Sequence, residues 1–163
     1  MYTDADGNKH YYTDQTDNYL QKNYQLLLNH SFSTAWNLNV ALHYTKGDGY
    51  YEEYKPGSSL VEYGLKPFNP DGTETNESDL VRQKKMDNKF GGGVFSLNYT
   101  GNRLTASLGG GLNQYRGNNF GKVTWVKNYI GNLSPEHEYY RNKSKKTDGN
   151  IYLKANYDLT RGL

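Results

Sequence analysis

The sequence contains no cysteine, which excludes disulfide bonds, thiolate metal sites and thiol catalysis. It also lacks any run of about 18 apolar residues, so no transmembrane helix is predicted. Basic residues barely outnumber acidic ones, 19 against 17, and the net charge is only +2. A charge this close to zero argues against nucleic acid as a partner.

Aliphatic residues are scarce. Hydrophobic residues make up 34% of the chain and the mean hydropathy is −0.99, whereas a soluble α/β enzyme would contain more Leu, Ile, Val and Ala. What is abundant is tyrosine, with 17 residues, and glycine, with 18. Aromatic residues at 15% in an alternating arrangement exclude a disordered chain. The composition fits an all-β protein, either a β-sandwich or a segment of a β-barrel.

The clearest pattern lies between Asn23 and Tyr44, where apolar and polar residues alternate in two runs. Side chains of a strand point alternately to opposite faces, so each run predicts a strand with one apolar and one polar face. The connector Ser33–Ala35 is short enough only for a hairpin. The apolar sides consist of Tyr24, Leu26, Leu28, His30 and Phe32 in the first run, and Trp36, Leu38, Val40, Leu42 and Tyr44 in the second. In the first run, Leu27 is the one clear apolar residue on the polar side.

Similar alternation continues along the chain. It predicts strands near residues 19–32, 36–47, 89–100, 104–115 and 149–159. Glycine, proline and polar residues predict long loops over residues 48–88 and 116–148. The lysines of the Lys84–Lys85 and Lys143–Lys146 clusters are interpreted as solvated loop residues.

Connections therefore alternate between short turns and long loops. Transmembrane barrels have this arrangement, and their strands need about 9–11 residues with aromatic residues at both membrane interfaces. We therefore predict one antiparallel up-and-down meander of about five strands, a segment of a transmembrane β-barrel. The alternative is a secreted or surface β-sandwich that binds glycans or proteins; a small β-rich hydrolase is a weaker third hypothesis.

Four stretches are similar to strands of TonB-dependent outer-membrane receptors from Bacteroidetes-type bacteria. They are Asp17–Leu26, Leu42–Lys55, Asp79–Asn88 and Lys145–Tyr152. The resemblance covers nearly the whole chain through many weak matches and includes no catalytic signature. It implies a place within a barrel of about 22 strands with a plugged lumen, located in the bacterial outer membrane.

The resemblance also implies a function for the intact parent protein. Such receptors import a scarce nutrient, such as an iron chelate, a vitamin or a glycan, with energy delivered through TonB. The partners would be outer-membrane lipid, the rest of the barrel, the plug domain and the TonB system. The present sequence shows no plug domain, no TonB box and no terminal strand, so the segment alone is not expected to transport anything. The chain ends, around Met1–Asp6 and Thr160–Leu163, are candidate boundaries of an excised segment.

Candidate ligand-binding residues lie in the two predicted loops. Aromatic faces stack on sugar rings and carboxylates accept hydrogen bonds from hydroxyl groups. An ordinary structural role, in loop packing or at the membrane interface, is the alternative. The candidates are Tyr50, Tyr51, Glu52, Tyr54, Trp125 and Tyr129.

No enzyme, cofactor or metal site is predicted. Glu52 and Glu53 are adjacent, so on a strand they would point apart instead of facing each other across a cleft as in a glycosidase. Glu136–Glu138 lacks the paired histidines of a zinc helix. The glycine runs Gly91–Gly93 and Gly109–Gly111 lack the lysine and helix of a phosphate loop, and they indicate bends or close backbone approach.

The apolar faces also predict the behaviour of the isolated chain. An open apolar wall flanked by unpaired strand edges drives association. The segment is therefore expected to self-associate in water.

Overall fold

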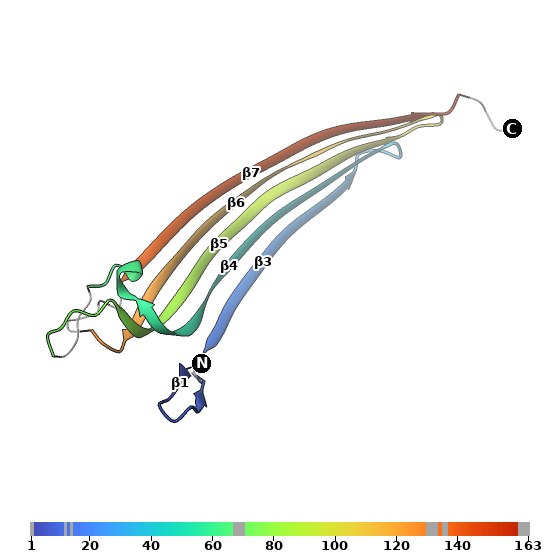
Figure 1. Ribbon diagram of the computed structural model, residues 1–163. Coiled ribbons are helices and arrows are strands. Elements are labelled where there is room, and N and C mark those ends of the chain that lie inside the picture. The colour runs from blue at the N-terminus through green and yellow to red at the C-terminus, as the bar shows by residue number, and fades with distance from the viewer. Residues whose placement is uncertain are drawn as a thin grey trace. The chain divides into compact units, whose positions relative to one another are not determined.

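The computed structural model describes residues 2–11, 13, 15–66, 71–129, 134 and 137–159. These residues form a two-stranded sheet, a five-stranded sheet and a short 3-10 helix, η1 (Figure 1). The elements are β1 (Tyr2–Thr3), β2 (Lys9–His10), β3 (Thr16–Ser31), β4 (Trp36–Ser59), η1 (Leu60–Tyr63), β5 (Glu77–Thr100), β6 (Leu104–Val126) and β7 (Glu138–Tyr157).

The five-stranded sheet is an antiparallel meander with the order β3-β4-β5-β6-β7, so neighbours in the sheet are also neighbours in sequence (Figure 1). This confirms the predicted all-β meander. The sheet is open, because β3 and β7 are its two edges and do not pair with each other. Within the described ranges, no helix has both the length and the apolar character needed to cross a membrane.

Both predicted short turns are present. At the first, the Phe32 amide donates to the Trp36 carbonyl over 3.0 Å, and the Ser33 hydroxyl accepts from the amides of Ala35 and Trp36, each over 3.2 Å. A serine that bonds its own following amides in this way closes a turn locally. At the second, the Gly101 amide donates to the Leu104 carbonyl over 2.8 Å.

The predicted long loops, 48–88 and 116–148, are mostly wrong. Strand β4 continues to Ser59 and β5 begins at Glu77, while β6 continues to Val126 and β7 begins at Glu138. Glycines that suggested a strand end have a different use: a Cβ at Gly49 would clash with the backbone of Asn18 and Tyr19 on β3. Close approach between strands, not termination, accounts for this glycine.

The N-terminal residues form the small hairpin β1–β2, in which Tyr2 pairs with His10 and Thr3 with Lys9. The Asp4 carboxylate closes it by accepting from the amides of Asp6 and Asn8 at 3.1 and 2.8 Å. A carboxylate that accepts from the following backbone amides forms an Asx-type turn, so this polar segment can form a hairpin.

The chain divides into two compact units, and each long strand contributes residues to both. Unit 1 comprises Met1–Leu20, Gly47–Asp87 and Gly117–Lys143; unit 2 comprises Gln21–Lys46, Asn88–Arg116 and Ser144–Leu163.

Unit 1 contains the small hydrophobic core of the protein. Leu60, Leu80 and Val123 are fully buried, and Tyr63 and Leu65 are nearly so. Helix η1 folds two of these side chains inward and ends at Gly64, whose φ of 67° is left-handed and suits glycine. The Leu65 amide then donates to the Leu60 carbonyl over 3.0 Å, which closes the turn.

Candidate functional site

Unit 2 has one face that is apolar and open. Ring contacts between strands fix which side chains share it: Tyr24 stacks on Tyr44 at 6.4 Å between ring centroids, and Trp36 lies 4.9 Å from Tyr99. Exposure is high, reaching 66% for Leu26 and 75% for Leu153. We call this surface the apolar face; its further members are Leu28, Phe32, Leu38, Val40, Leu42, Phe95, Leu97, Leu104, Ala106, Leu108, Leu112, Ile151, Ala155 and Tyr157.

Aromatic side chains stand at both ends of the apolar face. The end next to the two short turns, here the turn margin, has Phe32, Trp36, Tyr99 and Tyr157. The opposite end, here the far margin, has the stacked Tyr24 and Tyr44. Along β3 and along β4 the two margins are separated by about nine residues, which matches the length of a transmembrane strand.

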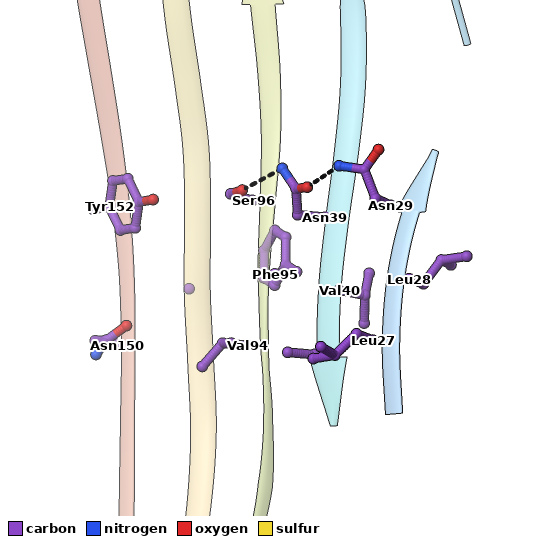
Figure 2. Close-up of a pocket in the computed structure, with 12 residues that line it drawn as sticks. Leu27, Leu28, Asn29, Asn39, Val40, Val94, Phe95, Ser96, Asn150 and Tyr152 are labelled. Carbon is purple, nitrogen blue, oxygen red and sulfur yellow. Dashed lines mark hydrogen bonds between the residues drawn. The ribbon is translucent and has the colours of Figure 1, made fainter. Parts of the chain in front are cut away.

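The other face of unit 2 is polar and linked by hydrogen bonds from strand to strand. Asn29 donates to Asn39, and Asn39 donates to Ser96 over 3.3 Å (Figure 2). Further along, the Ser107 hydroxyl donates to Asn98 over 2.7 Å. Five polar side chains thus satisfy one another on the face opposite the apolar one.

A shallow hollow of about 640 Å³ interrupts the polar face (Figure 2). Leu27, the residue that breaks the alternation in the sequence, lines it together with Val94 and Tyr152. The Tyr152 ring covers Gly109, where a Cβ would lie only 2.5 Å from the ring. The close backbone approach predicted for this glycine run occurs at Gly110, where a Cβ would lie 2.6 Å from the Asn150 carbonyl oxygen.

The predicted ligand-binding residues lie in unit 1, on strands more than on loops. Tyr50 faces Lys85, whose Nζ is 5.2 Å from the ring centroid, and the Glu52 carboxylate accepts from Gln83 over 2.8 Å. Tyr51, in contrast, points to the other face, where Lys84 lies over its ring at 5.7 Å. The sequence cluster is thus divided between two faces because neighbouring strand residues alternate.

Three of the six candidates come together. Glu52, Tyr54 and Trp125 line one hollow of about 390 Å³ with Val81 and Thr124. The Tyr54 hydroxyl donates to Asp79 over 2.6 Å, which holds its ring in place.

Tyr129 is not part of this hollow. It packs against the hydrophobic core of unit 1, which is the structural alternative considered for it above. It follows β6 and is the one candidate that lies outside a strand.

An ion pair that sequence reasoning missed lies beside the core. Arg82 donates from Nε to Glu53 over 2.7 Å and from Nη1 to the Tyr63 hydroxyl over 2.9 Å. Burial alone would raise the pKa of Glu53, but the hydrogen bond and charge of Arg82 outweigh it and leave that pKa below its ordinary value. The residues are 29 positions apart in sequence, and only their strand pairing brings them together.

Tyr139 borders the same ion pair. Burial raises the pKa of its hydroxyl to about 12, and within the described ranges that buried hydroxyl has no hydrogen-bond partner. The ring centroids of Tyr139 and Tyr63 are 4.7 Å apart, so Tyr139 contributes to packing through its ring and not through its hydroxyl.

In the part of the chain that the structure describes, no group of three or more His, Asp or Glu residues could hold a metal ion. Glu136, of the Glu136–Glu138 motif, lies outside the described residues. Glu52 and Glu53 contact different partners, Gln83 and Arg82, and so do not form a carboxylate pair.

No protein-family model matches this chain, and no curated protein or solved structure is detectably similar to it.

Proposed function

We propose that unit 2 is a membrane-embedded part of an outer-membrane β-barrel, and that the parent is a TonB-dependent receptor that imports a scarce nutrient. The observation that carries the proposal is the apolar face with aromatic residues at both margins. Contiguous exposed apolar surface beyond a few hundred Å² marks an interaction site or a membrane contact. Aromatic margins about nine residues apart favour lipid as the contact, since interfacial aromatic girdles border the apolar band of membrane barrels.

The polar face supports the same proposal. In lipid every polar group needs an internal partner, so polar side chains belong on the lumen side of a barrel strand. The chain of hydrogen bonds from Asn29 to Ser96 satisfies these groups without lipid contact. The open edges β3 and β7 would pair with further strands of the parent barrel, and the outer membrane is its proposed location.

The two tryptophans of the chain provide a direct test. Trp36 lies on the apolar face at the turn margin, whereas Trp125 lines the hollow in unit 1. Trp125→Phe leaves Trp36 as the only tryptophan, and Trp36→Phe is its matched control. In vesicles of phosphatidylcholine brominated on the acyl chains, fluorescence of Trp36 should be strongly quenched and that of Trp125 much less. Equal or absent quenching of the two would contradict the proposal.

The secreted or surface β-sandwich is the competing hypothesis. In a sandwich, the apolar face would be covered by a second sheet, and the chain would be a compact monomer. Light scattering after size-exclusion chromatography, with and without mild detergent, separates the two. A detergent-sensitive oligomer supports the membrane segment, and a monomer unaffected by detergent supports the sandwich.

For unit 1 we propose ligand binding at the hollow of Glu52, Tyr54 and Trp125. Trp125 is 45% exposed, so its ring is accessible for stacking, and Glu52 lines the same hollow with a carboxylate that can accept a hydroxyl hydrogen bond. A sugar ring is the chemistry that fits. Screening a glycan array with the wild type and with Trp125→Ala should show binding that the variant loses; Tyr129→Phe is a control outside the hollow. Binding that survives Trp125→Ala would refute the assignment.

A further inference from the structure

One row of cations crosses all five long strands of unit 2. The row consists of Lys22 on β3, Lys46 on β4, Lys89 on β5, Arg116 on β6 and Lys145 on β7. Lys46 is half-buried, and the other four side chains are exposed. Lys145 belongs to the Lys143–Lys146 cluster, which was interpreted as part of a solvated loop, but all five members of the row lie within strands.

Contacts between side chains fix the register of β3, β4 and β5. The Thr45 hydroxyl donates to Asn23 over 2.8 Å and Tyr24 stacks on Tyr44, so the next pair on the apolar side is Lys22 opposite Lys46. On the neighbouring pair of strands, Tyr44 lies over Gly91 and Leu42 over Gly93. This register sets Lys46 opposite Lys89.

The register of β5, β6 and β7 continues the row. Gly92 is opposite Asn113 and Gly111 is opposite Val94, which places Lys89 opposite Arg116. Gln114 donates to Thr147 over 3.3 Å, so two residues further along Arg116 is opposite Lys145. The Arg116 Nε donates to Gln114 over 2.8 Å, and both side chains therefore lie on this side of the sheet.

Such a row is unfavourable by itself. Neighbouring strands are about 4.8 Å apart, and like charges directly opposite each other destabilise a sheet. The five members of the row are all basic, so the row itself contains no carboxylate that would offset this repulsion.

The row has a defined position on the apolar face. It lies one side-chain pair beyond the far margin of Tyr24 and Tyr44, where lysine and arginine stems can cover apolar surface while their charges reach outward. The turn margin differs: within 32–36, 99–104 and 157–159 the one basic residue is Arg103. The excess of positive charge is therefore confined to one end of the apolar face.

We infer that this row binds the phosphate groups of anionic membrane lipids at the far margin. Several adjacent cations next to an apolar band match a lipid whose acyl chains contact the band and whose phosphates lie against the row. The inference rests on the proposed membrane location of unit 2. It adds to that proposal a preference for anionic lipid on one side of the membrane.

The test uses the full chain in phosphatidylcholine vesicles that contain a trace of spin-labelled phosphatidylglycerol or spin-labelled phosphatidylcholine. Electron paramagnetic resonance measures the relative association of each labelled lipid with the protein. The row variant is Lys22→Gln/Lys89→Gln/Lys145→Gln. The control, Lys9→Gln/Lys66→Gln/Lys154→Gln, removes the same charge elsewhere in the described chain. Inorganic phosphate is added in a separate arm.

We expect the wild type and the control to prefer phosphatidylglycerol by about fivefold or more, and the row variant to lose most of this preference. High salt should weaken it, because exposed charges are screened. Equal loss in both variants, or no preference in the wild type, would overturn the inference. Loss of the preference on adding inorganic phosphate at constant ionic strength would mean a free-phosphate site and would also overturn it.

Quenching of Trp36 fluorescence tests the membrane location of unit 2 independently of the lipid preference. Quenching by brominated phosphatidylcholine without lipid preference would refute only the cation row. Absence of quenching would refute both.

Discussion

Replacing Ile151 by lysine tests whether the apolar face contacts lipid or water. Ile151 lies on β7 about midway between the two margins, and 74% of its area is exposed, so the substitution removes little packing within the chain. In water, a surface change of this kind costs within about 0.5 kcal/mol. In lipid, a lysine near the bilayer midplane costs about 2–4 kcal/mol, a change of roughly 30- to 800-fold in the folding equilibrium.

Depth and face supply the controls. Tyr157→Lys, at the turn margin of the same strand, should cost only about 0–1 kcal/mol because the interface tolerates charge. Asn150→Lys adds the same charge on the polar face, and we expect little effect. The assay is guanidinium unfolding of the chain in phosphatidylcholine vesicles, followed by tryptophan fluorescence. A cost for Ile151→Lys no larger than that for Asn150→Lys would refute a lipid-facing assignment.

Three further predictions concern contacts within each unit. Gly109→Ala should destabilise the protein by about 1–3 kcal/mol because a Cβ would meet the Tyr152 ring, and the cost should shrink in a Tyr152→Ala background when both are measured by denaturant unfolding. The folded pKa of Glu53 is lowered from 4.5, so its pairing with Arg82 stabilises the protein above that pH, and this stability is lost as pH falls through the folded pKa. Arg82→Ala should cost about 1–3 kcal/mol of unfolding free energy at neutral pH and should reduce the loss of stability on acidification. A pH dependence of stability that is the same in Arg82→Ala as in the wild type would disprove the pairing. Tyr139→Phe should leave the midpoint of thermal unfolding unchanged or raised, since a buried hydroxyl without a partner costs free energy; clear destabilisation would reveal a hydrogen bond instead.

The position of the candidate binding residues could be predicted only in part. The sequence cluster of tyrosines and glutamates lies in unit 1, where Glu52 and Tyr54 line one hollow. It could not show that Tyr51 faces away from Tyr50, because the segment was interpreted as a loop, where alternation does not apply. The association of Trp125 with Tyr54 was equally invisible, since it depends on strands β4, β5 and β6 lying side by side.

Alternation by itself determined the division of unit 2 into an apolar and a polar face, together with the two hairpin turns. Side-chain direction in a strand changes at every residue, so a period of two is written locally in the sequence. The lengths of the strands were decided by tertiary structure. Residues 48–59 contain glycine, proline and charge, and they remain extended because β5 supplies hydrogen-bond partners across the sheet. The same non-local strand pairing brings Glu53 to Arg82. It also sets the register that aligns Lys22, Lys46 and Lys89. A strand can continue only as far as at least one neighbouring strand supplies hydrogen-bond partners, and that neighbour is not visible in a local stretch of sequence.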